Sequence, residues 1–558
     1  MRQHIALIAL LGGIPVALGI WPIPRSLETG TSALKLAPDF TIELNVHNPP
    51  ADLSAAVSRS ANYIKTDKLE QLVVGRGASN SSAVSRAPQL KSLTLSLEPG
   101  STVHSIMDEA IKEIGTRSEE YKLDVPASGE SATLTANSTL GLLRGLTTFE
   151  QLWYDLSGDT YTIQAPISVI DTPAYPFRGF MLDTARNFFN VSDIKRTLDA
   201  MSWVKISQFH WHVVDSQSFP LQIPGFMEVS QKGAYSSSMV YTPEDVQDIV
   251  QYAGERGIDV MVEIDIPGHT SVFSESHPDF VACAEASPWA TFASEPPAGQ
   301  LRFASATVKN FTAGLLTEVA KMFPSSIMST GGDELNTECY AQDPETQATL
   351  KETGQDLQQA LSVFMQAAQG ALQTQGKTPA VWEEMVLDNN VTLSNDTVVL
   401  VWISSMDAAA VAAKNFRIVH APSDYFYLDC GAGEWVGDDP EANSWCDPFK
   451  TWQKSYTFDP LANLTEAQTS LVLGGEQLLW TEQSSPANLD PIVWPRAASS
   501  AEVFWTGATL PGGEPRNGTE ALPRLHDVAF RMAQRGIRAI PLQPLWCALR
   551  PGKCNVDS

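Results

Sequence analysis

Short apolar runs alternate with amphipathic segments from residue 178 to the C-terminal part of the chain. The eight runs end at Asp183, Asp215, Glu263 with Asp265, Asp333 with Glu334, Trp382, Trp402, Tyr427 with Asp429, and Trp480 with Glu482. Two intervening segments have a helical period: residues 242–253, which Thr242 caps and Pro243 opens, and residues 308–322. Eight strand–helix units with polar strand ends predict a (β/α)8 TIM barrel, in which the helix expected at residues 386–396 is missing. A doubly wound open sheet fits this length less well.

The region before the barrel has a different pattern. Residues 93–97 alternate as Leu-Thr-Leu-Ser-Leu and predict a strand, and residues 121–125, 132–136 and 161–169 predict three more. Residues 141–152 predict a helix, whereas residues 75–88 are rich in Ser, Gly and Ala and predict an exposed loop or processing region. A linker is expected at Asp171-Thr172-Pro173. We therefore predict an α/β protein with a small α+β domain at residues 86–173 and the barrel at 174–558.

Residues 1–19 have the pattern of a signal peptide. Arg2 is followed by an apolar run at residues 5–18, and small residues stand at its end. A membrane anchor is the alternative, but two glycines and a proline interrupt the run, which is short for a membrane span. No later stretch is apolar and long enough to be transmembrane. The sequence therefore predicts a secreted, extracellular protein without a membrane anchor.

Composition narrows the choice of partners. The chain has 558 residues with 43% hydrophobic residues, which is typical of a globular protein larger than one ordinary domain. Its formal net charge of −27 argues against nucleic acid or an anionic membrane surface as a partner. Such a charge suits a secreted protein that works in acid.

Six cysteines in an exported chain are expected to pair. Fifteen connectivities are open, and neighbour pairing is the simplest: Cys283–Cys339, Cys430–Cys446 and Cys547–Cys554. None of the spacings is that of a zinc finger. Eight sequons are candidate glycosylation sites and fit passage through the secretory route: Asn80, Asn137, Asn190, Asn310, Asn390, Asn395, Asn463 and Asn517.

Gly331-Gly332-Asp333-Glu334 is the stretch with the clearest chemistry. Glycine allows a backbone to turn sharply or to approach a ligand closely. Two carboxylates at one strand end repel each other, so at least one should hold its proton near neutral pH, as a general acid must. A polar turn after a buried strand is the alternative for so short a match, and the same four letters also occur in the signature loop of cyclic-dinucleotide synthases.

Histidines and tryptophans at other strand ends add to this picture. His210 and His212 lie on one face of a strand, because side chains alternate. Zinc binding is conceivable but has no H-E-x-x-H or thiolate partner in the sequence, so packed or sugar-binding histidines are favoured. Trp382, Trp402 and Trp480 fall at predicted strand ends, where flat walls would stack against a sugar ring.

With these residues in place, the chain resembles the family 20 glycoside hydrolases, the β-N-acetylhexosaminidases, in particular the secreted fungal type. The similarity covers about residues 174–510, and the N-terminal module matches as well. It rests on Arg178-Gly179, Leu182-Asp183-Thr184-Ala185-Arg186, the His210–Phe219 stretch, Tyr241–Asp245, Glu263–His269, Gly331–Glu334, Trp382-Glu383-Glu384, Tyr427–Asp429, Leu473–Glu476, Trp480 and Trp494-Pro495-Arg496. The nucleotide-synthase alternative fails because that domain is far shorter and lacks this series.

The resemblance implies a role for each of the following residues. Glu334 would be the general acid, Asp333 would hold the acetamido N–H of the substrate, and Tyr427 would hold its carbonyl side. Asp215 and His269 would support Glu334. The remaining expected substrate-binding residues are Arg178, Asp429 and Glu482 for ring hydroxyls, and Trp382, Trp402 and Trp480 for the pocket walls. No cofactor and no metal are expected.

Two positions depart from the family pattern. Ser329 stands where many members have His, and Ser216 stands where many have a second Asp. Neither position touches the expected acid, so only the supporting hydrogen bonds should differ. Fungal relatives also carry a pro-segment, for which residues 20–85 are the candidate, together with the start of the N-terminal region; a homodimer and retention of the pro-segment are further expectations by analogy.

We therefore expect a retaining exo-glycosidase that removes terminal β-linked N-acetylglucosamine, and N-acetylgalactosamine, from chito-oligosaccharides or glycans. Adjacent side chains on an extended strand point to opposite faces, so Asp333 and Glu334 are poorly arranged to flank one bond as acid and nucleophile. The expected nucleophile is the 2-acetamido oxygen of the substrate, which would give an oxazolinium intermediate. The alternative is a secreted carbohydrate-binding protein that has lost catalysis on the same scaffold.

Overall fold

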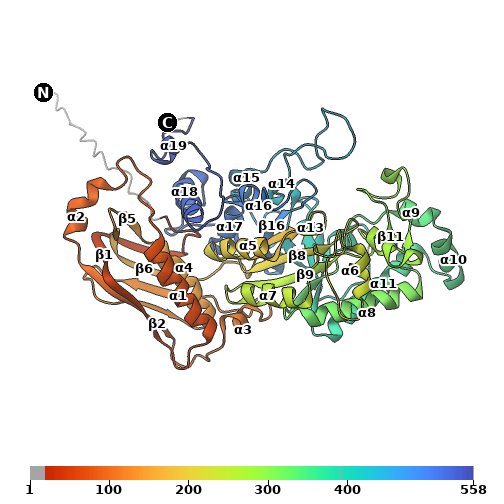
Figure 1. Cartoon of the computed structure of the whole chain (residues 1–558), viewed down its shortest axis with the longest axis horizontal. Coiled ribbons are helices and arrows are strands. Elements are labelled where there is room, and N and C mark those ends of the chain that lie inside the picture. Colours follow the sequence, from red (N-terminus) through yellow and green to blue (C-terminus); the bar gives the residue numbers. More distant parts are fainter. Residues whose placement is uncertain (1–18, 390, 557–558) are drawn as a thin grey trace.

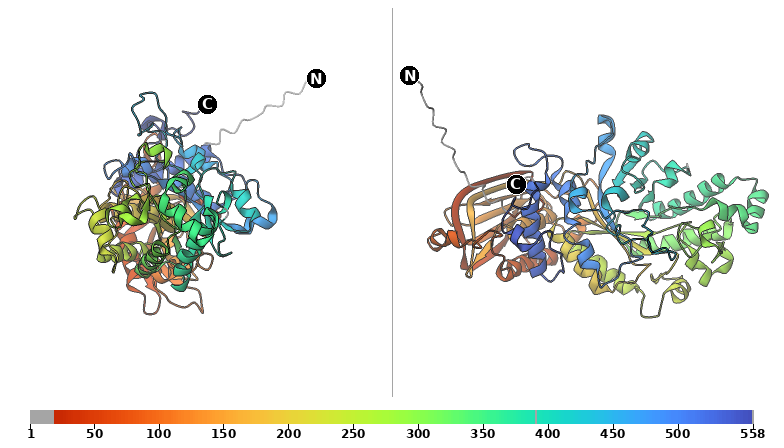
Figure 2. Two further views of the ribbon diagram at one scale, coloured as in Figure 1. Left: turned by 90° about the vertical axis from the view of Figure 1, so that its right-hand side faces the viewer. Right: turned by 90° about the horizontal axis from the view of Figure 1, so that it is seen from above.

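The computed structural model describes residues 19–389 and 391–556. A sheet domain at the N-terminal end lies beside a larger barrel, and the C-terminal helices return to the junction between them (Figures 1 and 2). The expected signal peptide falls almost entirely outside the described residues. No helix in the described ranges is long and apolar enough to cross a membrane.

The N-terminal domain is built on a six-stranded mixed sheet. Its strands are β1 (Ser26–Asn45), β2 (Gln89–Leu97), β3 (Tyr121–Val125), β4 (Ala132–Ala136), β5 (Tyr154–Leu156) and β6 (Asp159–Asp171). The order is β1-β2-β4-β3-β6-β5, and the long β1 also pairs with β6. The four predicted strands are confirmed as β2, β3, β4 and β6, because alternating burial accompanies their alternating sequence.

The predicted boundary near residue 85 is wrong as a structural boundary. β1 pairs with β2 over Thr41–Asn45 and with β6 over Ser26–Thr29, so residues before 85 supply a strand of the same sheet. No apolar alternation marks β1 in the sequence, because most of its side chains are at least partly exposed. Removing residues 20–85 as a pro-segment would open this sheet.

Four helices accompany the sheet. They are α1 (Ala51–Thr66), α2 (Ser81–Ser85), α3 (Ile106–Ala110) and α4 (Thr139–Glu150). The predicted helix is confirmed as α4, and every one of its residues is buried because the helix lies between the sheet and the barrel (Figure 1). The guanidinium of Arg144 on α4 donates to the backbone oxygen of Gly257 at the base of the barrel, 2.7 Å away.

Eight parallel strands form the closed barrel that the sequence predicts. They are β7 (Phe177–Asp183), β8 (Gln208–Val214), β9 (Asp259–Ile264), β12 (Ile327–Ser329), β13 (Thr378–Trp382), β14 (Val398–Val401), β15 (Arg417–His420) and β16 (Val472–Leu479). The predicted seventh strand is misplaced: Tyr427 and Asp429 follow β15, and only a single bridge joins Tyr427 to Leu478 of β16. The apolar run that ends at Tyr427 and Asp429 is therefore not a strand; it lies in a loop at the mouth of the barrel.

The barrel strands are joined and covered by helices, and a short hairpin of β10 (Val281–Ala282) and β11 (Gln300–Leu301) follows β9. These helices are α5 (Val191–Trp203), α6 (Met227–Gly233), α7 (Pro243–Gly254), α8 (Ala306–Met322), α9 (Thr337–Gln342), α10 (Pro344–Thr353), α11 (Leu357–Thr374), α12 (Glu384–Leu387), α13 (Ala408–Ala413), α14 (Ser423–Phe426), α15 (Trp452–Tyr456), α16 (Leu489–Val493) and α17 (Ala498–Thr506). Thr242 and Asp245 form a capping box at the start of α7, as expected. The predicted absence of a regular helix between β13 and β14 is confirmed for the residues described there, which form only the single turn of α12.

The C-terminal elements α18 (Gly518–Gln534) and α19 (Leu545–Ala548) lie near the N-terminal domain (Figure 2). Arg531 of α18 and Arg535, which follows it, both pair with Asp67 after α1, at 3.0 and 2.7 Å. The Tyr154 hydroxyl of β5 donates to Asp527 of α18 at 2.5 Å. These buried polar contacts hold the two domains and the C-terminal helix as one packed unit.

All three cystine pairs follow the predicted neighbour pairing: Cys283–Cys339, Cys430–Cys446 and Cys547–Cys554. Six of the eight sequon asparagines have exposed side chains, Asn80 is partly exposed, and Asn390 lies outside the described residues. Their occupancy stays a prediction.

Candidate active site

The expected acid and its neighbours meet at the carboxyl end of the barrel strands. Asp333 and Glu334 follow β12, and His269 follows β9. His269 Nε2 lies 3.5 Å from Asp333 Oδ2 and 3.2 Å from Glu334 Oε2. Glu334 keeps 29% of its side chain exposed, whereas Asp333 is 93% buried. One imidazole therefore contacts both carboxyl groups, and Glu334 is the one open to solvent.

Asp215 completes the support that was expected behind Glu334. Its Oδ1 lies 3.2 Å from His269 Nδ1, and its Oδ2 accepts a hydrogen bond from His212 Nε2 at 2.8 Å. Burial disfavours a charged His269, but Asp215 and then Asp333 outweigh it and raise the pKa of His269 well above its ordinary value. His269 is thus held as an imidazolium that faces Glu334.

Local backbone geometry explains the two glycines before Asp333. Gly331 and Gly332 have φ of 59° and 104°, and Glu334 also has a positive φ of 54°. A Cβ on Gly331 would lie 2.1 Å from Oδ1 of Asp265, and this same oxygen accepts the Gly332 N–H at 2.7 Å. The loop therefore turns tightly around the Asp265 carboxyl group, which a larger residue would block.

Burial changes the protonation of the carboxyl groups in the pocket. It raises the pKa of Asp333 well above the ordinary value, and the nearby charge of Asp265 raises it further. Burial likewise raises the pKa of Asp265 to about 7. The expectation that one of two adjacent carboxyls holds a proton is thus met by Asp333, but its partner in repulsion is Asp265 more than Glu334.

Glu383 and Glu384, directly after β13, hold one wall of the pocket. Glu383 Oε2 accepts the backbone N–H of Trp402 and Glu384 Oε2 accepts its indole N–H, both at 2.8 Å. Glu384 Oε1 also accepts the backbone N–H of Glu334 at 3.3 Å. Burial raises the pKa of Glu383 to about 9 and that of Glu384 to about 8. These groups position Trp402 and the acid loop.

The three tryptophans expected as pocket walls, Trp382, Trp402 and Trp480, lie together with Tyr427 in one aromatic cluster. Trp402 and Tyr427 are stacked at 6.2 Å between ring centroids, and Trp480 lies 6.2 Å from both Tyr427 and Trp382. Trp445 packs edge-on against Trp402 and Tyr427 at 5.6 and 5.8 Å, yet 63% of it is exposed. The aromatic lining thus extends from the buried pocket to the outer surface of the Cys430–Cys446 loop.

Arg186 is a second cation at this site, beside the His269 imidazolium. It follows β7, its guanidinium stacks over Trp480 at 5.0 Å, and it is paired with Asp215 at 3.1 Å and with Glu295. Glu482 is close enough for its charge to raise the pKa of Arg186. Asp429 and Glu482 also interact, and burial raises the pKa of both carboxyl groups. Charged and polar side chains therefore converge here.

Arg178 is not in this pocket, and its predicted role is wrong. It lies at the opposite, N-terminal end of β7, is 99% buried and pairs with Glu119 at 2.6 Å. Its other guanidinium hydrogen bonds go to the backbone oxygens of Lys205 and Tyr175, at 3.0 and 2.8 Å. The sequence motif contains two arginines, and strand direction selects the second one, Arg186, for the barrel mouth.

The two strand histidines left open by the sequence are internal ion-pair partners. His212 Nδ1 lies 2.6 Å from Glu263, and His210 Nδ1 lies 2.9 Å from Glu476. Burial opposes their charge, but Glu476 and Glu263 raise the pKa of His210 to about 9, and Asp215 and Glu263 raise that of His212 to about 10. Ser329 donates to Glu263 at 2.5 Å, so the departure from the family pattern adds a hydroxyl to this buried network.

Three described groups of side chains have the spacing for a cation: Asp215, His269 and Glu295; Asp265, His269 and Asp333; and Asp429, Cys430 and Cys446. In the third, both sulfurs are in a disulfide. The first two share His269, whose raised pKa disfavours the neutral imidazole that a metal needs. We therefore assign these groups to proton chemistry.

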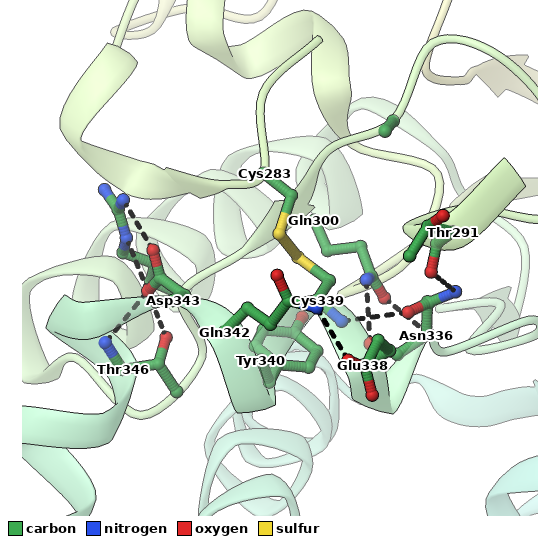
Figure 3. Close-up of a disulfide and its surroundings, with 12 residues drawn as sticks. Cys283, Thr291, Gln300, Asn336, Glu338, Cys339, Tyr340, Gln342, Asp343 and Thr346 are labelled. Carbon is green, nitrogen blue, oxygen red and sulfur yellow. Dashed lines mark hydrogen bonds and ion pairs between the residues drawn. A yellow bond between two sulfur atoms is a disulfide. The ribbon is translucent and has the colours of Figure 1, made fainter. Parts of the chain in front are cut away.

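The Cys283–Cys339 disulfide joins two loops that reach the site (Figure 3). The loop from Cys283 carries Glu295, and Cys339 lies in the first turn of α9, the helix that follows the Glu334 loop. Gln300 and Asn336 exchange two hydrogen bonds, from Gln300 Nε2 to the Asn336 oxygen and from the Asn336 N–H to Gln300 Oε1, at 3.1 and 2.9 Å. These contacts fix the Glu295 loop against the acid loop.

Sequence reasoning missed four residues of this site: Arg186, Glu295, Asp265 and Trp445. Arg186 and Asp265 stand within the quoted motifs, and their position after β7 and β9 was a usable signal. Glu295 lies in a loop of small residues and prolines, and Trp445 lies in an acidic loop, so neither had a periodic pattern to reveal it.

A closed barrel with paired carboxyls, an imidazolium and an aromatic pocket at its carboxyl end defines the class of glycoside hydrolases. The description "Glycosyl hydrolase family 20, catalytic domain" matches residues 175–508, and "beta-acetyl hexosaminidase like" matches residues 20–152. The chain therefore belongs to glycosyl hydrolase family 20 and is an enzyme of the β-N-acetylhexosaminidase type.

Individual proteins agree with this. A "Beta-hexosaminidase" of Arthroderma benhamiae is 34% identical over 468 residues, covering 78% of this chain and 74% of that protein. A "Chitooligosaccharidolytic beta-N-acetylglucosaminidase" of Bombyx mori is 35% identical over 458 residues, with the same coverage of 78% and 74%. The family 20 exo β-N-acetylglucosaminidase structure from Vibrio harveyi, solved with N-acetylglucosamine, has a TM-score of 0.73 at 23% identity and covers 94% of this chain and 78% of that chain. The last of these supports the fold alone.

Proposed function

We propose that the chain is a retaining exo-enzyme that removes terminal β-linked N-acetylhexosamine by substrate-assisted catalysis. The observation that carries the proposal is the contact of one imidazolium, His269, with both Asp333 and Glu334, at 3.5 and 3.2 Å. Both carboxyl groups are thus tied to one side of the site. They do not face each other across a space for a scissile bond.

In this proposal Glu334 is the general acid. It is the more exposed of the two carboxyls, as proton transfer to a leaving glycosidic oxygen requires. Transfer of its proton leaves a carboxylate beside the His269 imidazolium, whose charge is fixed by Asp215. The carboxylate then accepts a proton from the water that opens the intermediate, so Glu334 ends the cycle protonated.

The 2-acetamido oxygen of the substrate is the proposed nucleophile. Asp333 accepts the acetamido N–H, and the Tyr427 hydroxyl donates to the carbonyl, so the amide is held with its oxygen toward the anomeric carbon. Bond formation there gives an oxazolinium ion, whose positive charge a desolvated Asp333 carboxylate would stabilise strongly. Arg186, Asp429 and Glu482 bind ring hydroxyls, while Trp382, Trp402 and Trp480 enclose the ring.

The mechanism has a direct test. We expect retained anomeric configuration by NMR and much tighter binding of a thiazoline analogue than of N-acetylglucosamine. Asp333→Asn should weaken the thiazoline more than the product sugar. A stable glycosyl adduct on Asp333 or any other carboxylate, found by mass spectrometry after trapping with a slow 2-fluoro sugar, would show that the protein supplies the nucleophile.

The acid is tested separately by Glu334→Gln, which keeps the shape and removes the proton donor. We expect kcat on a substrate with a poor leaving group to fall about 10²–10⁴-fold while the product sugar still binds. Near-normal kcat would mean that Glu334 is not the general acid, which would then have to be Glu383, Glu384 or Glu482. The same measurement separates the enzyme from a catalytically silent carbohydrate-binding protein, for which the wild type would have no turnover.

We further propose that the substrates are chito-oligosaccharides or glycans that end in N-acetylglucosamine or N-acetylgalactosamine, and that the protein acts outside the cell. The named activity of the Bombyx mori relative supports the first point. Three disulfides support the second, because they persist in oxidising compartments. Comparing kcat/KM for the gluco and galacto chromogenic substrates would set their ratio.

A further inference from the structure

Asp265 has no assigned role, yet the acid loop is built around it. It follows β9, is 99% buried and accepts the Gly332 N–H at 2.7 Å through Oδ1. A Cβ on Gly331 would collide with this same oxygen. The carboxyl group therefore lies directly behind Asp333, at the centre of the Gly331–Glu334 turn.

Two buried carboxyl groups interact here, and one oxygen of each has no donor. One oxygen of Asp265 and one of Asp333 lie within 4.8 Å of each other and of a His269 nitrogen. Asp265 Oδ2 and Asp333 Oδ1 are both buried, and no other group in the described part of the chain donates a hydrogen bond to either. Two ionised carboxylates in this position would repel each other and leave both oxygens unpaired, which is costly in a buried site.

We infer that Asp265 and Asp333 share one proton as a carboxyl dyad, and that Asp265 takes this proton when Asp333 must be ionised during catalysis. This inference rests on the proposed role of Asp333 in holding the acetamide. A single proton between the two oxygens satisfies both of them. The proton stays within the pair, so the step needs no other donor, acceptor or water.

The dyad resolves a conflict in the site. In the empty pocket burial raises the pKa of Asp333 well above its ordinary value, so that this carboxyl is neutral. An acetamido N–H aimed at Asp333, and then a positive oxazolinium ring, both favour the carboxylate. Because Asp265 also has a pKa raised by burial, to about 7, it can hold the proton that Asp333 gives up.

Other charges face the pair and set its total protonation. The positive group is His269, whose charge lowers the pKa of both aspartates. The carboxyl groups that face the pair are Glu334 beside Asp333 on the same loop, Glu384 after β13, Glu263 on β9 and Asp215 after β8. One imidazolium against this set of carboxyl groups favours retaining one proton in the dyad.

The variant Asp265→Asn tests the inference. Its amide oxygen keeps the bond from Gly332, and its NH2 donates permanently to Asp333, which holds Asp333 as a carboxylate. At low pH the inactivating proton must then add to Asp333 alone, beside an amide and not beside a second carboxyl group, so we expect the acidic limb of the kcat–pH profile to shift by about one unit. We expect kcat at the optimum to fall less than about tenfold, whereas Asp265→Ala should lose about 10²-fold because Gly332 and Asp333 both lose a partner.

Asp259→Asn is the matched control, because Asp259 is a buried carboxyl at the other end of β9, far from the pocket. It should leave the acidic limb in place. An acidic limb for Asp265→Asn that coincides with that of the wild type would overturn the inference and leave Asp265 as a support for Gly332 only. A stoichiometric divalent cation in the purified enzyme would overturn it as well.

A second readout needs no turnover. Glu383 and Glu384 also hold buried protons at pH 6, so the infrared spectrum of Asp265→Asn is subtracted from that of the wild type. The difference should contain the band of a buried protonated carboxylic acid, both free and with the thiazoline analogue bound. Loss of this band on binding the analogue would contradict a proton that stays in the dyad. The band in the free enzyme does not depend on turnover. A glycosyl adduct would disprove the proposed nucleophile, whereas absence of the band would disprove the shared proton, so the two failures can be told apart.

Discussion

Removal of the Cys283–Cys339 disulfide should weaken both stability and catalysis, and the structure gives the magnitude. The bridge closes a loop of 56 residues, while Cys547–Cys554 closes one of 7 residues. In the chain-entropy estimate, these loops stabilise the fold by about 4 and about 2 kcal/mol. The longer bridge also joins the Glu295 loop to α9, which the acid loop leads into.

The test compares two double variants, Cys283→Ala with Cys339→Ala and Cys547→Ala with Cys554→Ala. Urea unfolding should show the larger loss of unfolding free energy for the first, by about 2 kcal/mol. Its kcat should also fall by about tenfold or more, because small displacements of catalytic groups are costly, while kcat of the second stays near that of the wild type. Equal losses of stability and of kcat in the two variants would refute the reasoning.

Two further predictions follow from the placement of single residues. Arg186→Lys should raise KM about tenfold or more with an intact fold, whereas Arg178→Met should lower the unfolding free energy and leave KM unchanged; steady-state kinetics and thermal unfolding of both variants decide this. Trp445→Ala should raise KM for N,N′-diacetylchitobiose several-fold but change KM for a small chromogenic glycoside little, because Trp445 is exposed beyond the buried pocket. Equal changes for the two substrates would contradict an outer sugar contact.

The barrel was predictable because its strands are buried on both faces and end in polar residues. Seven of the eight expected runs coincide with strands, and the apolar-to-polar switch at Asp333 or Trp382 marks the point where a strand leaves the core. The run at Tyr427 failed because an aromatic side chain packed in a pocket wall has the same sequence appearance as a strand end. β1 failed for the opposite reason, since a half-exposed strand has no apolar signature.

The order of the motifs and the polar ends of the strands predicted part of the candidate site. These two features placed Asp333, Glu334, His269 and Asp215 together on one face. They did not separate Arg178 from Arg186, because the two arginines share a motif and only the direction of β7 places them at opposite ends of the barrel. Asp265 was hidden because its role depends on the buried space behind Gly331, which sequence spacing does not reveal.

Arg178 belongs to a buried charge cluster that joins the two domains. The stability of the protein in acid should depend on this cluster. Glu119 of the N-terminal domain pairs with Arg144 at 2.7 Å and with Arg178 at 2.6 Å, and all three side chains are buried. Burial raises the pKa of Glu119, but the charges of Arg178 and Arg144 outweigh it and lower the pKa to about 2. Burial lowers the pKa of Arg178 to about 10, so its charge persists throughout the acid range.

The sign of the pH effect follows from that depressed pKa. Because it lies below the ordinary value of 4.5, ionised Glu119 contributes its full stabilisation above about pH 5, and the contribution is lost as the pH falls toward 2. A shift of this size corresponds to about 3 kcal/mol. Glu119→Gln should therefore be less stable than the wild type at pH 7, because two buried guanidinium groups lose their carboxylate. The difference in unfolding free energy should shrink by about 3 kcal/mol between pH 5 and pH 2.

Urea unfolding of both proteins across this pH range measures the difference in unfolding free energy, with Glu318→Gln on the surface of α8 as the control. Parallel stability curves for Glu119→Gln and the wild type would mean that this carboxyl takes up its proton equally in the folded and unfolded chain, and that the cluster does not couple the domains through charge.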